Sequence, residues 1–267
     1  MNYRRFVAVG DSCTEGIDDP YPDGNGYRGW ADLVAQRLAT HEPGLHYANL
    51  AVRGRRLDQI LAEQVITACE LRPDLASVFG GGNDLLQNRW DPNMIVASLD
   101  STVRALSRIA RTTLMFTLPD FSGHVPGTRR LRPKIEFLNA TLEAIAERYG
   151  AVLIDLRGHP ASHDRRYFGA DRLHLGTRGH EMLAAQVLRL LDVPPAMHWI
   201  DPLPRPDAEP RWRRTAGDMR WLREHVIPAA IGAVRNRVIG RQPGDGFTPK
   251  HAELRPVSGT LESTGSC

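Results

Sequence analysis

Cysteine is scarce in this chain of 267 residues, and its three cysteines, Cys13, Cys69 and Cys267, lie far apart. No CxxC pair is present, so the sequence offers neither a zinc knuckle nor the cysteine spacing of a disulfide framework. An odd number of cysteines fits a reducing compartment. We therefore expect a cytoplasmic protein that does not depend on disulfide bonds.

Long apolar runs are also lacking. No stretch approaches the roughly 18 apolar residues that a membrane-spanning helix needs. The run 6–9 near the N-terminus is too short for the core of a signal peptide, and no small-residue cleavage site follows it. The sequence therefore predicts a soluble protein with no integral membrane segment.

The sequence has little excess of either charge. It contains 34 basic and 31 acidic residues, a formal net charge of +3, and no basic stripe before its C-terminal region. A dedicated nucleic-acid binder usually shows a stronger basic excess over its main domain. With 42% apolar and 24% charged residues the chain has a globular composition, and we expect no nucleic-acid partner.

Short apolar runs alternate with helical patterns from the N-terminus to about residue 193. Strands are expected near residues 6–9, 46–50, 75–79, 113–118 and 151–156. Between them, apolar residues recur at the spacing of amphipathic helices. Strict alternation predicts an α/β fold: a three-layer, doubly wound domain over residues 1–193, with five parallel strands and helices on both faces.

The composition changes after residue 193. Residues 194–214 contain six prolines and are interpreted as a linker, because proline does not fit a regular helix interior. Residues 215–240 show an apolar stripe at helical spacing, which predicts a C-terminal helical extension kinked near Pro228. Residues 241–267 are expected to be disordered. Packing on the main domain is the favoured role of the helix; the alternatives are a second subunit and a membrane surface.

Four polar clusters follow predicted strands, at 10–16, 49–54, 81–84 and 171–174. In a parallel sheet the carboxyl ends of the strands meet at one edge, where ligands bind. Each cluster alone has an ordinary explanation as a helix cap, a turn or a surface ion pair. A catalytic site is favoured because all four clusters are expected at the same edge of the sheet.

Together these clusters supply the parts of a serine hydrolase. Ser12 needs a base because a free hydroxyl is a weak nucleophile at neutral pH, and His174 can serve as that base. Asp171, three residues before His174, can orient its imidazole ring. The oxyanion hole is expected to consist of the backbone N–H groups of Ser12 and Gly54 and the side-chain amide of Asn83.

These motifs resemble those of the SGNH (GDSL-type) hydrolase family. Gly-Asp-Ser at 10–12 resembles its first block, 49–54 the block with the oxyanion glycine, Gly-Gly-Asn-Asp at 81–84 its GxND block, and 171–174 its DxxH block. All four stand in family order over roughly residues 5–192. The resemblance implies a flavodoxin-like sheet, no cofactor, and hydrolysis of esters or thioesters. It does not extend past about residue 195.

Aromatic side chains in the loops near this edge are candidates for contact with the substrate. Tyr27, Trp90 and Phe121 can stack on a sugar, hold an acyl chain, or only cover the loops. Among the neighbours of the motifs, Glu15 is expected to be a capping or surface residue and His180 a surface residue of a helix.

The leading hypothesis is an esterase for a small ester substrate, with short acyl groups such as the O-acetyl esters of sugars. The same triad also suits an acyltransferase, a lysophospholipase or a thioesterase. A metal-dependent phosphoesterase using Asp11, Asp84, Asp171 and His174 is a further alternative, although Gly54 and Asn83 would then have no role. An inactive binding module is the third class. The residues show no convincing metal-ligand set, so no metal is expected, and the oligomeric state stays open.

Overall fold

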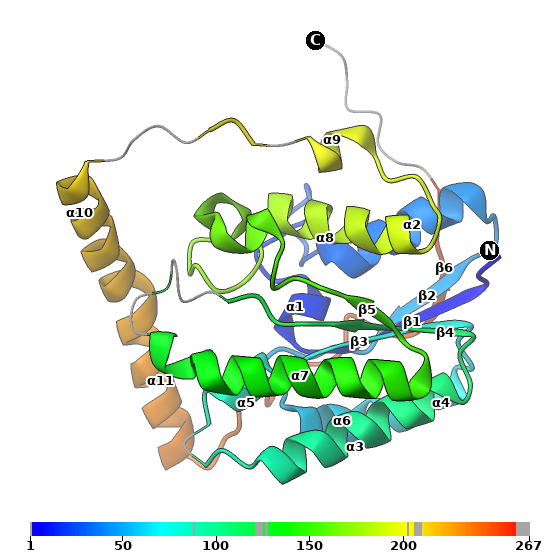
Figure 1. The fold of residues 1–267 in the computed structure, drawn as a ribbon, viewed down its shortest axis with the longest axis horizontal. Helices are drawn as coiled ribbons and strands as arrows, with labels where there is room; N and C mark the ends of the chain where they lie inside the picture. Colours follow the sequence, from blue (N-terminus) through cyan, green and yellow to red (C-terminus); the bar gives the residue numbers. More distant parts are fainter. Residues whose placement is uncertain are drawn as a thin grey trace.

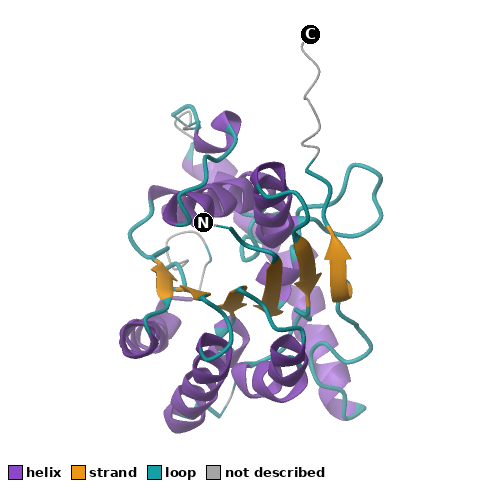
Figure 2. Ribbon diagram, turned by 90° about the vertical axis from the view of Figure 1, so that its right-hand side faces the viewer, coloured by secondary structure: helices purple, strands orange, loops and turns teal. Residues whose placement is uncertain are grey.

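The computed structural model describes residues 2–87, 89–120, 125, 128–201, 203–205 and 210–259. Its centre is one sheet of six strands in the order β5-β4-β3-β1-β2-β6, shown edge-on in Figure 2. The strands are β1 (Arg5–Gly10), β2 (His46–Asn49), β3 (Leu75–Phe79), β4 (Thr112–Phe116), β5 (Val152–Ile154) and β6 (His251–Pro256). The first five are parallel, as the alternation of strands and helices predicts.

The sixth strand corrects the prediction of a five-stranded, purely parallel sheet. Strand β6 pairs with β2 in antiparallel register, with His46 opposite Pro256 and Asn49 opposite His251. The prediction of a disordered segment over 241–267 is therefore wrong for residues 251–256, while 260–267 lie outside the described residues. The strand is an exposed edge strand, so it has no alternating apolar pattern that would reveal it.

Helices cover both faces of the sheet, as Figure 1 shows. One face carries α2 (Gly29–His41) and α8 (Thr177–Leu190), which pack together. The other carries α3 (Leu57–Glu63), α4 (Val65–Glu70), α6 (Pro92–Ser107) and α7 (Arg132–Tyr149). Apolar residues of the strands and of the inner helix faces form one core cluster. This three-layer arrangement leaves the carboxyl ends of the strands open for a site.

Beyond the main domain the chain forms a long helical segment beside that open end. It consists of α10 (Arg211–Trp221), a π-helical turn (Leu222–Val226) and α11 (Ile227–Val238), whereas the short α9 (Met197–Ile200) packs on α8. The segment after α11 returns across the domain to β6; we name residues 240–256 the C-terminal strap. No helix within the described ranges has the length and apolarity that crossing a membrane requires.

His180 is not the surface residue that its sequence position predicts. Its side chain is fully buried, its Nδ1 accepts the backbone N–H of Trp30 at 3.1 Å, and its Nε2 lies 3.1 Å from the carbonyl oxygen of Ile17. Burial lowers its pKa to about 4, because the apolar surroundings disfavour the charged ring. The neutral imidazole therefore joins α8 to the N-terminus of α2 and to the loop after the one-turn helix α1 (Ser12–Glu15).

We expect this buried histidine to make the stability of the fold depend on pH. Because its folded pKa lies below the unfolded value of 6.5, its contribution is complete above about pH 6.5 and is lost as the pH falls toward 4. From about pH 7 to about pH 4.5 the wild type should lose about 2–3 kcal/mol of unfolding free energy relative to His180→Gln. Urea unfolding of both proteins at the two pH values measures this, and a constant difference would contradict it.

Candidate active site

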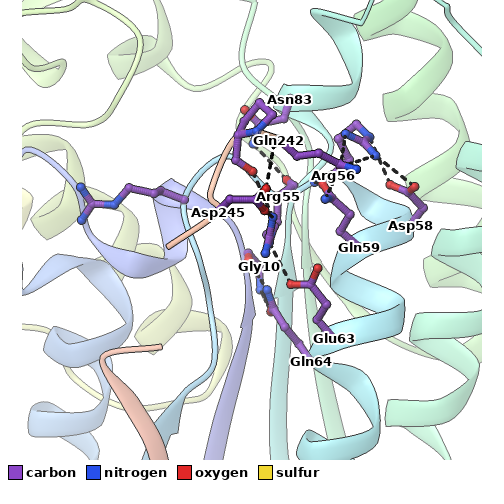
Figure 3. Close-up of polar contacts among 12 residues, drawn as sticks. Gly10, Arg55, Arg56, Asp58, Gln59, Glu63, Gln64, Asn83, Gln242 and Asp245 are labelled. Carbon is purple, nitrogen blue, oxygen red and sulfur yellow. Dashed lines mark hydrogen bonds and ion pairs between the residues drawn. The ribbon is translucent and has the colours of Figure 1, made fainter. Parts of the chain in front are cut away.

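Ser12 lies at the start of a one-turn helix directly after β1. This helix, α1 (Ser12–Glu15), has Asp11 as its N-cap, whose carboxylate accepts the backbone N–H of Cys13 at 3.2 Å. Gln64 fixes the end of the strand, because its side-chain amide pairs with both the N–H and the carbonyl of Gly10 (Figure 3). The first N–H groups of a helix have no intrahelical partner, so the N–H of Ser12 is available to a ligand.

Three of the predicted residues form a continuous hydrogen-bonded chain. Ser12 Oγ lies 2.8 Å from Nε2 of His174, and Nδ1 of His174 lies 2.5 Å from Oδ2 of Asp171. The other carboxylate oxygen of Asp171 accepts the backbone N–H groups of Leu173 and His174 at 2.8 and 3.0 Å. The structure thus brings together residues 162 positions apart in the arrangement of nucleophile, base and orienting carboxylate.

The pKa values of His174 and Asp171 suit a proton transfer from Ser12 to His174. Burial acts to lower the pKa of His174, but the hydrogen bond and the charge of Asp171 outweigh it, so the pKa is raised above 6.5. Burial is the largest single influence and acts to raise the pKa of Asp171, but the hydrogen bond and charge of His174 and the backbone N–H groups of Leu173 and His174 together outweigh it, so the pKa is held below 3.8. An ionised Asp171 therefore stabilises the imidazolium that forms when His174 takes a proton.

The loop that carries Asp171 and His174 is anchored by residues that the sequence does not single out. Arg172 is buried and makes an ion pair with Asp218 of α10 at 2.5 Å. The indole N–H of Trp221 donates to the carbonyl of Asp171 at 2.8 Å, and the guanidinium of Arg172 stacks over the same ring at 5.0 Å. The C-terminal helical segment therefore holds the histidine loop in place.

The side-chain amide of Asn83 already has two partners within the protein. It donates to Oδ2 of Asp11 at 3.1 Å and to the carbonyl of Arg55 at 3.0 Å. Asn83 is the second residue of a one-turn helix at this edge, α5 (Gly82–Leu85), and lines the same cavity as Ser12. To donate to a bound ester, the amide has to exchange one of these two hydrogen bonds.

Gly54 lies at the carboxyl edge of the sheet, as predicted. The structural reason for a glycine at this position is, however, not the expected approach of a substrate to its backbone N–H. Its φ of +79° is the left-handed conformation that side chains disfavour. A Cβ at this position would lie 2.9 Å from Pro243 and Gly244, so the missing side chain makes room for the C-terminal strap rather than for a substrate. Gly54 does not line the cavity at Ser12.

The C-terminal strap is tied to the Gly54 loop by polar contacts, which Figure 3 shows. Arg55 donates to the carbonyl of Pro243 at 3.2 Å and to Asp245 at 2.9 Å. Gln59 donates to the side chain of Gln242 at 2.8 Å. Since the carbonyl of Arg55 accepts from Asn83, these contacts connect the strap to the amide at the cavity.

We expect Asp245→Ala to lower kcat by about tenfold and to leave KM nearly unchanged. The ion pair with Arg55 is partly exposed, so its loss costs little stability, but it lets the loop that holds Asn83 move out of position. Asp100→Ala, which removes the Arg148 ion pair on the α6–α7 surface, is the matched control. Equal kcat values for both variants and the wild type would show that the strap has no positioning role.

A small, mainly apolar cavity of about 100 Å³ opens beside Ser12 and His174. Its apolar lining comes from strand ends and from the loops after them. These residues are Phe79, Leu86, Leu118, Pro119, Leu156, Phe168, Leu173 and Leu175. A cavity of this lining, next to a nucleophile, accommodates a short hydrocarbon group such as the acyl part of an ester.

Of the three aromatic residues proposed to contact the substrate, Tyr27 and Trp90 do not line this cavity. Tyr27 is half-buried and its ring faces the guanidinium of Arg53 at 5.4 Å. Trp90 packs edge-on against Phe137 of α7 with ring centroids 6.0 Å apart. Phe121 lies outside the described residues. The cavity is instead lined by aliphatic residues and by Phe79 and Phe168, which the sequence does not distinguish from core residues.

Glu15 is likewise not a surface residue. It is buried, and its carboxylate accepts both the backbone N–H of Arg53 at 2.8 Å and the guanidinium of the same residue. Arg53 in turn faces the ring of Phe247 at 4.4 Å. The first motif, the glycine loop and the C-terminal strap are therefore connected through one buried ion pair.

One group of side chains in the described part of the chain could hold a metal ion, namely Asp18, Asp171 and His174. Both ring nitrogens of His174 are already engaged, one with Asp171 and one with Ser12, so a metal would have to displace the triad contacts. The set proposed for a phosphoesterase does not gather around one point, since Asp84 instead accepts the backbone N–H of Leu57 at 3.2 Å. The arrangement favours nucleophilic over metal chemistry.

Comparison with known proteins agrees with the fold. An acetylxylan esterase from Geobacillus stearothermophilus is 19% identical, with a TM-score of 0.59 over 75% of this chain and 97% of that one. A lipase/acylhydrolase from Enterococcus faecalis is 23% identical, with a TM-score of 0.56 over 73% and 99%. An α/β hydrolase from the Lake Arreo metagenome is 21% identical, with a TM-score of 0.56 over 70% and 94%. No curated protein matches the sequence.

A parallel-dominated α/β sheet with a serine, a histidine and a carboxylate at its open edge defines a class of carboxylic ester hydrolases. The model of the GDSL-like lipase/acylhydrolase family matches residues 8–182. The chain belongs to this family, which confirms the resemblance of its motifs. The matched region ends before the C-terminal helical segment and the C-terminal strap.

Proposed function

We propose that the protein hydrolyses small carboxylic esters through an acyl-enzyme on Ser12. The observation that carries the proposal is the chain of contacts from Ser12 through His174 to Asp171, at 2.8 and 2.5 Å. A serine at this distance from a histidine with a raised pKa is a nucleophile beside its general base.

In the first step Ser12 Oγ attacks the carbonyl carbon of the ester while its proton passes to Nε2 of His174. The negative charge on the carbonyl oxygen is stabilised by the N–H group of Ser12 and by the amide of Asn83, which exchanges one of its two hydrogen bonds within the protein for this one. The N–H group of Gly54, which does not line the cavity, stays a prediction of the sequence motif as the third donor. The C–O bond to the alcohol then breaks, and the alcohol leaves with the proton of His174. Water, deprotonated by His174, then attacks the acyl carbon. The bond to Ser12 Oγ breaks, Oγ takes the proton back from His174, and the carboxylic acid departs.

The cavity favours a short acyl group. Its volume of about 100 Å³ and its apolar lining suit an acetyl or similarly short chain beside Ser12. One structural neighbour is an acetylxylan esterase, which supports O-acetyl esters of sugars as candidates. An acyltransferase, a lysophospholipase or a thioesterase is the alternative with the same triad. A cytoplasmic location stays a proposal that rests on the odd number of cysteines.

A screen of p-nitrophenyl esters from acetate to octanoate and of acetylated sugars tests this function. We expect the highest kcat/KM for the shortest chains, because longer chains exceed the cavity. EDTA should leave the activity unchanged, since the mechanism uses no metal. Activity that is lost with EDTA and restored by one divalent ion would contradict the mechanism, and a preference for octanoate would contradict the acyl assignment.

A further inference from the structure

The long helical segment beside the active site presents a continuous apolar stripe to solvent. Its seven residues are between 39% and 79% exposed. They are Trp212, Met219, Leu222, Ile227, Ile231, Val234 and Val238. We name these residues the apolar stripe. An exposed apolar surface of this extent on an otherwise well-packed protein marks a site of interaction.

The π-helical turn keeps the apolar stripe on one face. On either side of it the residues follow each other at intervals of three, four or seven, the spacing of one face of an α-helix. Across the π-helical turn Leu222–Val226 the interval is five, from Leu222 to Ile227. A π-turn contains one residue more than an α-turn, so it absorbs the extra position. Without it the two halves of the stripe would face different directions.

Side chains of α10 outside the apolar stripe fix the segment to the hydrolase domain by polar contacts. Asp218 pairs with the buried Arg172, and Trp221 donates to the carbonyl of Asp171, the triad carboxylate residue. Figure 1 shows α10 and α11 beside the end of the sheet that carries α1, the helix of Ser12. Whatever binds the apolar stripe therefore lies next to the active site.

A hollow lies between the apolar stripe and the cavity at Ser12. It has a volume of about 680 Å³ and lies between α11 and the loop at 83–87. Val234 of the stripe lines it on one side, and Asn83 and Leu86 line it on the other. Asn83 and Leu86 also line the cavity of the catalytic serine. The hollow and the cavity therefore adjoin at Asn83 and Leu86.

The charge of the segment indicates what binds there. Residues 211–241 contain eight arginines and two acidic residues, a net charge of +6, whereas the whole chain carries only +3. The remainder of the chain is therefore net negative. Arg235 and Arg237 are exposed and stand one position from Val234 and Val238, so they border the stripe on both sides. An apolar centre bordered by arginines matches a surface of acyl chains below anionic headgroups.

A second copy of the chain fits this surface less well. Pairing two stripes would bring two segments of charge +6 together, and like charges at an interface are unfavourable. The two acidic residues do not compensate, because Asp218 is paired with Arg172 and Glu224 with Arg223. An anionic lipid surface, in contrast, attracts every arginine.

We propose that the apolar stripe and its arginines dock the protein on an anionic lipid surface, with the active-site edge facing the lipid. Docking itself does not depend on the proposed esterase activity. Where both hold, an ester whose alcohol part lies in the lipid surface is held beside the edge that carries Ser12, with its short acyl group next to the cavity. The proposal thus adds a binding partner and a direction of substrate entry to the hydrolase.

Co-flotation of the full chain with vesicles tests the docking. We expect binding to phosphatidylcholine vesicles that contain phosphatidylglycerol, weaker binding to pure phosphatidylcholine, and loss of binding as salt screens the arginines. Ile227→Ser combined with Ile231→Ser should weaken binding at least about tenfold. Ile66→Ser is the matched control, because Ile66 is an equally exposed isoleucine on α4, outside the stripe, and should leave binding unchanged.

Three results would overturn the proposal. The first is no binding of the wild type to anionic vesicles, and the second is an equal loss of binding in the Ile66→Ser control. The third is a dimer in sedimentation velocity that the Ile227 and Ile231 substitutions dissociate, which would assign the apolar stripe to a second copy. Because flotation involves no ester cleavage, its outcome is separate from that of the proposed function, and Ser12→Ala should float like the wild type.

Discussion

Ser12→Ala is expected to lower kcat for p-nitrophenyl acetate by at least about 10⁴-fold, and His174→Ala by a similar factor. Without Oγ no acyl-enzyme forms, and without the imidazole the hydroxyl, 2.8 Å away, has no acceptor for its proton. Because the two residues act in one step, the double variant should be little worse than either single variant.

Both variants should keep the fold, because the triad lies at the sheet edge and not in the core cluster. Circular dichroism and the urea midpoint provide the control. A fully active Ser12→Ala protein with an unchanged spectrum would rule out the serine mechanism. Losses that multiply in the double variant would show that the two residues act independently.

Asn83→Ala is expected to lower kcat by about 10²- to 10³-fold with little change in KM. If the amide donates to the carbonyl oxygen, its hydrogen bond strengthens as negative charge develops there, so its loss affects the transition state more than the bound ester. The substitution also removes a hydrogen-bond donor to the carboxylate of Asp11. Burial raises the pKa of this carboxyl group to about 6.

Asn83→Asp should lower kcat further than Asn83→Ala does. A carboxylate at this position would face both the oxyanion and the carboxylate of Asp11, which accepts from Asn83 at 3.1 Å. Steady-state kinetics of both variants, with the rate of fluorophosphonate labelling of Ser12 as a second readout, test this order. A raised KM with kcat intact would make Asn83 a substrate-binding residue and exclude its oxyanion role.

The sequence predicts the central fold well because its strands are buried on both sides. Such strands appear as short apolar runs, and β1 and β3 lie where these runs predict them. Strand β6 has the opposite character, since its residues His251–Pro256 are largely exposed and include charged side chains and a proline. An edge strand of this kind has no pattern that separates it from coil.

The site shows the same division. The triad is predictable because Ser12, Asp171 and His174 belong to motifs whose residue types carry their own chemistry. The anchoring contacts of Arg172 and Trp221 are not predictable from the sequence. These two residues acquire their roles only when the folded chain brings α10 against the loop that carries Asp171.

His180 and Gly54 illustrate why position along a sequence does not reveal an environment. His180 follows the triad histidine by six residues, where an exposed helix residue is the ordinary expectation, yet it is fully buried between α8 and α2. Gly54 is where the motif places it, but its conformation is required by the close approach of the C-terminal strap. Both depend on segments that pack from elsewhere in the chain.

Intact-mass analysis after treatment with a fluorophosphonate tests the central claim most directly. The account predicts one adduct per chain on the wild type, located on Ser12 by peptide mapping, and none on Ser12→Ala. It also predicts slow labelling of His174→Ala, because the hydroxyl then lacks its base at 2.8 Å. Ester hydrolysis by a wild-type protein that takes up no adduct, or an adduct on any other residue, would contradict it.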